Sequence, residues 1–195
     1  KLINIDMGDD YNNVMTARMT IPENKYPEPQ QKLALFNTLK EQIKQHPQVV
    51  DVVSNSWNPG AIVTLEGYDY ASEEDKPKID TITVIGDTAT VGINLVAGRQ
   101  LDHHDKLGSR KTALISQSMA KRYWPGESPL DKSFSIKINE VNEKVFVVVV
   151  VIDRLNPATL FGKLDSGDEI YLYGLQVIDN HHMVYYRTLP NTQNP

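Results

Sequence analysis

Cysteine is absent from the 195-residue chain. Without thiols, no disulfide can stabilise the fold, and catalysis by a thiolate is excluded. The absence is compatible with an oxidising compartment, where stray thiols are a liability, but it does not assign one.

Basic charge is also scarce. The chain has 20 Lys and Arg residues against 25 Asp and Glu residues, which gives a net charge of -5 and a pI near 5.5. Binding to nucleic-acid phosphates requires a concentrated basic face. We therefore predict that the chain has no nucleic-acid partner.

Long apolar runs are missing as well. A membrane helix needs roughly 20 consecutive apolar residues. The longest run here, residues 145–152, is far shorter and almost entirely β-branched, so it predicts a buried strand. The chain begins at Lys1, and no signal-peptide pattern follows. We expect a processed or engineered N-terminus that further sequence once preceded.

Motifs for nucleophilic catalysis and nucleotide binding are absent. The chain has no Gly-x-Ser-x-Gly elbow and no Gly-x-Gly-x-x-Gly or other Gly-rich phosphate loop. Asp6, Asp9 and Asp10 lack the spacing and the distal Glu of a calcium loop. The acidic run at residues 73–75 is typical of a solvated loop. We therefore predict no enzyme activity, no catalytic residues and no bound cofactor or metal.

One cluster of metal-ligand residue types tests this prediction: Asp102, His103, His104 and Asp105. Histidine and carboxylate side chains bind zinc. The spacing is poor, because neighbouring residues on a strand point to opposite faces and no pair of histidines is four residues apart. A solvated loop after the turn predicted at residues 97–99 is the favoured interpretation, and a metal-dependent hydrolase is the alternative.

Three other features could indicate a functional site, but each also has a structural explanation, which we favour. His181 and His182 lie between two late predicted strands, where a loop tip is favoured over a metal site. The segment 165–168, Asp-Ser-Gly-Asp, is typical of a turn. Trp57 and Trp124 have the chemistry for ligand stacking, but packing is favoured, especially for Trp124 beside a proline at a helix end.

The periodicity of the chain predicts an α+β fold with more strands than helices. Alternation over residues 14–21 predicts a half-buried strand whose inner side chains are Met15, Ala17, Met19 and Ile21. A helix is predicted at residues 30–45, with Leu33, Phe36, Leu39 and Ile43 on one face. A second helix, capped by Ser116 or Ser118, is predicted to end near residue 124. Further strands are predicted at residues 49–54, 62–65, 79–85, 111–116, 133–138, 145–152, 169–173 and 183–188, with a turn and candidate boundary at residues 58–60.

Several short sequence motifs, taken in their order along the chain, resemble those of the MacB-like periplasmic core domain. Residues 114–130, LISQSMAKRYWPGESPL, are similar to the family's strand, its helix ending in Trp/Phe-Pro-Gly, and the following Pro-Ile/Leu-Gly-Lys. Ala97-Gly98-Arg99 before an acidic loop resembles the family's Ala-Gly-Arg phrase, and residues 14–49 resemble its opening βαβ unit. The match keeps its order over nearly the whole chain.

The chain also departs from the family pattern. Asp131 stands where a glycine is usual before Lys132, and Gln48 replaces the usual glycine of Pro-Gly-Val. Val149 and Ile152 stand where the long strand often has glycines. Because glycine permits a bend in a strand, the geometry near Val149 is expected to differ.

The resemblance implies two subdomains. Residues 1–56 with residues 169–195 would form a porter-like βαβ subdomain from both chain ends, and residues 57–168 would form an inserted β-rich subdomain. The helix and last strand of a second βαβ unit, which normally follow the strand at residues 183–188, are expected to be absent.

The resemblance further implies the extracytoplasmic domain of an FtsX-like ABC transporter permease. Such a domain lies on the periplasmic or extracellular face of the bacterial inner membrane, within a multi-pass protein. It couples ATP-driven motion to substrate export or to a partner protein, while a separate nucleotide-binding domain or subunit binds the ATP. Implied partners are that ATPase, a membrane-fusion adaptor, an outer-membrane channel and a second permease copy. Trp57, Tyr68 and Tyr70 are candidates for partner contact, although core packing is the favoured role of each. A free-standing secreted binding module is the other alternative.

Overall fold

The chain folds around one mixed β-sheet, as its computed structural model shows for residues 13–86, 95–99, 101, 104–138, 142–152, 167–177 and 180–189. The elements in these ranges are β1 (Val14–Thr20), α1 (Pro29–Lys44), β2 (Val49–Leu65), the 3-10 helix η1 (Glu73–Asp75), β3 (Lys78–Ile85), β4 (Leu95–Gly98), β5 (Thr112–Ser116), α2 (Gln117–Tyr123), β6 (Ser133–Ile138), β7 (Asn142–Ile152), β8 (Glu169–Tyr173) and β9 (His181–Thr188). The predicted α+β class is confirmed. None of these helices is long and apolar enough to cross a membrane.

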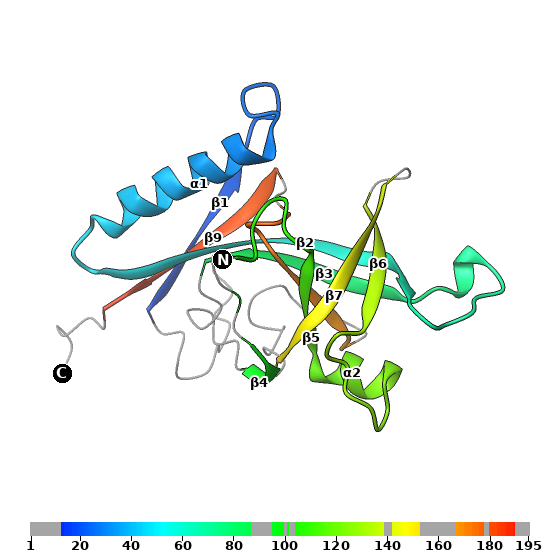
Figure 1. Ribbon diagram of the computed structural model, residues 1–195. Coiled ribbons are helices and arrows are strands. Elements are labelled where there is room, and N and C mark those ends of the chain that lie inside the picture. The colour runs from blue at the N-terminus through cyan, green and yellow to red at the C-terminus, as the bar shows by residue number, and fades with distance from the viewer. Residues whose placement is uncertain are drawn as a thin grey trace, which may run out of the picture.

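Six of the strands close into a ring, which we call the strand ring. The order along the sheet is β1-β9-β2-β3-β8-β5-β7-β4, and β6 joins β7 back to the far end of β2. The ring therefore runs β2, β3, β8, β5, β7, β6 and returns to β2 (Figure 1). Closure of this kind removes exposed strand edges.

The main hydrophobic core is built by the strand ring and α2. Every ring strand contributes side chains to one buried cluster, and α2 and the following residues add Met119, Ala120 and Trp124. Phe134 of β6 and Phe146 of β7 stack at the centre with ring centroids 6.0 Å apart, and both are at most 1% exposed. These two strands pair antiparallel, and β7 begins at Asn142, before the start at residue 145 predicted for it.

The other end of the sheet, which we call the open end, consists of β1, β9, the first part of β2 and helix α1. Strand β9 lies between β1 and β2, antiparallel to both, and α1 lies over one face of these strands (Figure 1). The helix begins at Pro29, a residue suited to the first helical position. A capping box between Glu28 and Gln31 satisfies backbone groups at this end. Phe36 is fully buried, as its helical face predicts, and the stem of Lys32 is buried beside it.

The half-buried strand predicted at residues 14–21 is only partly correct. Strand β1 forms, but Met15 is 54% exposed and Ala17 is exposed as well, and burial becomes complete only at Ile21. Within the described residues, β1 is the last strand at its side of the sheet and pairs only with β9. Alternation predicted which side chains share a face, but the strand's place at the edge determined how much of that face is covered.

Two predicted turns are strand segments instead. Residues 58–60 lie within the 17-residue strand β2, where the pairing with β3 shifts between Asn58 and Ala61. Gly60 has a φ of 63°, and its amide donates to the Asp80 carboxylate at 2.8 Å. Asn-Pro-Gly therefore forms a bulge rather than a chain reversal. Similarly, Ala97 and Gly98 end strand β4, which pairs with β7.

The backbone is unusual at two of the positions where the sequence departs from the family pattern. Asp131 has a φ of 67°, a left-handed conformation that glycine adopts freely and that Asp tolerates. In β7, the register with β5 passes from Val148 to Val150, so the backbone bulges at Val149. The strand is therefore irregular at this position although the residue is valine rather than glycine.

Candidate functional site

The candidate metal cluster is not assembled as a metal site in the described residues. Both carboxylate oxygens of Asp105 accept hydrogen bonds from the Arg99 guanidinium, each at 2.7 Å. Asp105 is 3% exposed, and the Thr112 hydroxyl also donates to it at 3.3 Å. His104 is exposed, and Asp102 and His103 lie outside the described residues. The Asp105 oxygens that a metal would need are therefore engaged by Arg99.

The segment after Asp105 is held by Gln176 from the turn that follows β8. The Gln176 side-chain oxygen accepts from the Thr112 amide at 2.9 Å and from its hydroxyl at 3.0 Å. Its side-chain nitrogen donates to Ser109 Oγ and to the Arg110 carbonyl, both at 2.8 Å. These contacts tie the approach to β5 to a segment 64 residues away, which is a structural role.

The second histidine pair lies in a strand, so the predicted loop tip is wrong. His181 and His182 begin β9 and point to opposite faces, because side chains alternate along a strand. His181 is exposed and lies 3.4 Å from the Thr20 hydroxyl, whereas His182 is 2% exposed and lies 3.0 Å from Ser54 Oγ. Ser54 is 0% exposed, so this serine–histidine pair has no access to a substrate and serves the packing of β2 on β9.

The end of the predicted turn at residues 165–168, Gly167 and Asp168, meets the start of α2. Residues 165 and 166 lie outside the described ranges. The Gly167 carbonyl accepts from the Ser118 hydroxyl, and Asp168 pairs with the Arg122 guanidinium at 3.0 Å. Ser116 Oγ accepts from the Met119 amide and caps α2, as predicted, and it also accepts from the Glu169 amide at 3.0 Å. Side chains of α2 and its cap thus anchor the chain as it enters β8.

Four aromatic side chains form a continuous series, which we call the aromatic ladder: Tyr70, Tyr68, Tyr123 and Trp124. Consecutive ring centroids are 6.4, 6.3 and 6.4 Å apart. Trp124 is 6% exposed and lies in the core, as predicted, whereas Tyr68 is 40% exposed. The Tyr68 hydroxyl donates to the Tyr123 carbonyl. Burial, followed by the nearby Asp168 charge, raises the pKa of Tyr123.

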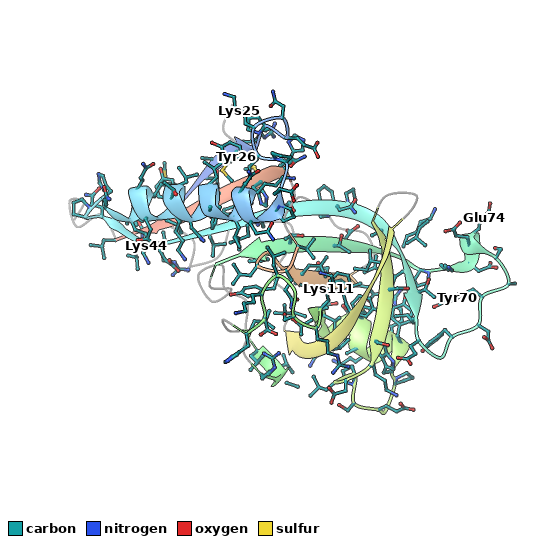
Figure 2. The ribbon with its side chains drawn as sticks, turned by 45° about the horizontal axis from the view of Figure 1, so that its top comes forward. Lys25, Tyr26, Lys44, Tyr70, Glu74 and Lys111 are labelled. Atoms are coloured by element: carbon teal, nitrogen blue, oxygen red, sulfur yellow. The ribbon has the colours of Figure 1, made fainter. Side chains whose placement is uncertain are left out.

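The exposed end of the ladder lies in the loop from β2 to β3, which we call the acidic tip (residues 66–77). Its acidic residues are exposed, namely Glu66, Asp69, Glu73, Glu74 and Asp75. The tip lies at the opposite end of the molecule from Lys44 of α1, as the labels of Glu74 and Tyr70 in Figure 2 show. The Asp75 carboxylate accepts from the Ser72 amide and hydroxyl at 2.9 Å and orders η1. The tip is the best candidate for a functional surface in the described residues.

Sequence reasoning identified parts of this surface but not their assembly. Tyr68 and Tyr70 were candidates for partner contact, and the carboxylates at residues 73–75 were assigned to a solvated loop. The contact with Tyr123 was not predicted, because Tyr123 belongs to α2 and follows Tyr68 by 55 residues in the sequence. Trp57, the third partner candidate, is 42% exposed but lies on β2, outside both the ladder and the tip.

Comparison with known proteins gives likeness in structure alone. No protein-family model matches the chain, and no curated protein matches its sequence. The periplasmic region of MacB from Actinobacillus actinomycetemcomitans superposes with a TM-score of 0.61 at 16% identity, covering 94% of this chain and 78% of that one. The extracellular domain of the noncanonic ABC-type transporter YknZ from Gram-positive bacteria gives a TM-score of 0.57 at 14% identity, covering 93% of this chain and 86% of that one.

At sequence identities this low, the structural similarity establishes a shared fold and nothing more. The structural similarity extends over nearly the whole chain in both comparisons. The sequence motifs that resemble the family are in the same order over the same extent of the chain. The chain therefore has the fold of MacB-like periplasmic domains, and the resemblance predicted from its sequence is confirmed at that level.

Proposed function

We propose that this chain is the extracytoplasmic domain of an ABC transporter permease and couples ATP-driven motion to substrate export or to a partner protein. The observation that supports this proposal is the shared fold with two such transporter domains over 94% and 93% of the chain. On this proposal, the ATP is bound by a separate domain or subunit. An adaptor, an outer-membrane channel and a second permease copy are its expected partners.

The topology supports a porter-like subdomain at the open end. In a split βαβ unit, a helix connects two parallel strands and a third strand lies antiparallel between them. β1, α1, β2 and β9 have this arrangement. The division into residues 1–56 with 169–195 and residues 57–168 stays a prediction; β8 begins at its second boundary and pairs with β3 and β5 of the strand ring.

The coding sequence around this chain tests the permease assignment directly. A permease parent has one hydrophobic span before Lys1 and about three after Pro195, each of roughly 20 apolar residues. A cleavable signal peptide with no later span would instead establish the secreted-module alternative.

The side of the membrane is tested by labelling intact cells, since this chain contributes no cysteine of its own. In the full-length parent, with any cysteines elsewhere replaced, Glu41→Cys places a thiol on the exposed side of α1. A membrane-impermeant maleimide should label it without lysis. Ala113→Cys, at a position that is 0% exposed, is the unlabelled control. Labelling of Glu41→Cys only after lysis would overturn an extracytoplasmic location.

A further inference from the structure

We propose that β1 is a self-association edge, along which two copies of this chain join their sheets by pairing β1 antiparallel with β1 of the other copy. The association depends on the geometry of this strand, so it is the same for a permease domain and for a secreted module. It gives a surface to the second copy expected above, while the span and labelling tests of the permease assignment are independent of it.

The backbone of β1 has one open side. The strand pairs with β9 in an uninterrupted register over all seven of its residues, and no other described strand pairs with it. The Thr188 amide donates to the Asn13 carbonyl at 2.8 Å, which places the backbone groups of the odd-numbered residues of β1 toward β9. The backbone groups of the even-numbered residues therefore point to the open edge: Val14, Thr16, Arg18 and Thr20.

The two outer strands of the sheet differ in how they are protected against pairing. Natural edge strands are protected by short length, bulges, proline or charges. Strand β4 has only four residues, and its register shifts between Leu95 and Ala97. Strand β1 has seven residues, no proline and a single charge, on Arg18, and residues 15–18 are all exposed. An incoming strand therefore meets little that would prevent pairing with β1.

The sequence of β1 selects one register with its own copy. Two identical strands related by a two-fold axis pair antiparallel, and a register centred on Ala17 brings every outward-facing residue opposite another one. Val14 then lies opposite Thr20, and Thr16 opposite Arg18 of the other copy. A register centred on Arg18 would place two guanidinium groups opposite each other, which is destabilising. A register centred on Thr16 would leave Thr20 without a partner in the strand.

The side chains of the odd-numbered residues fit the same register. Met15 is 54% exposed, and Ala17, on the same face, is exposed as well. In the register centred on Ala17, Met15 lies opposite Met19 of the other copy, and the two Ala17 residues lie opposite each other. These are the close, non-hydrogen-bonded pairs of an antiparallel ladder. Pairing therefore buries an apolar seam, to which methionine side chains adapt well, so a second copy suits β1 in both charge and side-chain pattern.

Disulfide trapping tests the register, since the chain has no cysteine of its own. Ala17→Cys should form a covalent dimer under mild copper-phenanthroline oxidation, because Cα atoms about 4.5 Å apart permit a disulfide. Met15→Cys is the matched control: this position is 54% exposed, but its two copies would lie roughly 14 Å apart. Crosslinking of Ala17→Cys should be at least about tenfold faster. Equal rates, or no dimer with Ala17→Cys, would overturn the proposal.

Sedimentation equilibrium tests the association without a crosslink. The wild type should show a reversible monomer–dimer equilibrium. Thr16→Pro removes an outward-facing amide that the two-fold axis uses twice, and should weaken the dimer about tenfold or more. Thr16→Ala keeps that amide and should stay within about twofold of the wild type. Because the amide of residue 16 does not face β9, an edge strand tolerates the proline, and a thermal melt of each variant checks that it is folded.

Two results of the sedimentation experiment would contradict the proposal. A wild type that stays monomeric at every concentration would overturn it and leave the edge of β1 to a strand from elsewhere in a longer parent chain. A dimer of unchanged strength in folded Thr16→Pro would place the contact between copies on another surface.

Discussion

The strand ring and the open end are two parts of one sheet that differ in how completely their side chains are buried. In the ring, every strand has neighbours on both sides, and the inner side chains form one continuous cluster. In the open end, burial falls off towards the outer strand: Val184 and Tyr185 of β9 are 1% and 2% exposed on opposite faces, while Met15 of β1 is 54% exposed. Burial therefore follows a strand's position in the sheet more closely than its own sequence pattern.

The largest difference between the two regions is expected for substitutions of their apolar side chains. Phe146→Ala removes a ring that is 0% exposed and stacked on Phe134, and should lower the free energy of unfolding by about 3–5 kcal/mol. Met15→Ala, at the edge of the open end, should change it by less than about 0.5 kcal/mol. Urea denaturation of both variants measures these values, and similar losses would show that the two regions do not differ in this way.

A smaller effect is expected where the two regions meet. Gly86 follows β3 with a φ of 117°, and a Cβ there would lie 2.7 Å from Val53 Cγ2 and 3.1 Å from the Val52 carbonyl. Gly86→Ala combines backbone strain with this clash, and we expect a loss of about 3 kcal/mol.

Gly67 in the acidic tip is the matched control for Gly86. It has a φ of 83°, but nothing lies within 4 Å of an added Cβ. Gly67→Ala should therefore cost only the backbone strain, about 1 kcal/mol. Equal melting temperatures for the two variants would show that β2 gives way easily at Val53, and that the joint between the regions is loosely packed.

The smallest effect is a pH dependence within the open end. Burial raises the pKa of Tyr185, while a hydrogen bond from Asn55 partly opposes this shift. The unfolded chain therefore loses this proton first as the pH rises past about 10, the ordinary tyrosine value, and stability falls. We expect the urea midpoint to fall less between pH 8 and pH 10.5 for Tyr185→Phe than for the wild type. Parallel falls would mean that Tyr185 does not contribute to the alkaline loss.

Local structure was predictable from the sequence where a physical cause lies within a few residues. The apolar face around Phe36 placed α1 within a residue of its observed bounds, and Ser116 capped α2 as expected. The turn predicted at residues 58–60 was wrong because Asn-Pro-Gly satisfies a bulge as readily as a reversal. The closure of the ring depends on pairs such as Asp80 with Glu169, which no local pattern encodes.

The candidate surface was predictable only in part for the same reason. The residue types at Tyr68 and Tyr70 suggested partner contact, but Tyr123 joins them only through the packing of α2. Asp105 was assigned to a solvated loop because nothing in its spacing revealed the bidentate contact from Arg99 that buries it. Residue chemistry could be listed in advance, whereas the availability of each group depended on its neighbours in space.

Strand β2 passes through both regions without a break, pairing first with β9 and then with β6. Its 17 residues correspond to about 55 Å of contour at about 3.3 Å per residue. Tension between α1 and the acidic tip therefore loads one continuous backbone, and the hydrogen bonds to β3 resist it along the strand direction. A pull applied at either end would therefore be carried to the other through the backbone of β2.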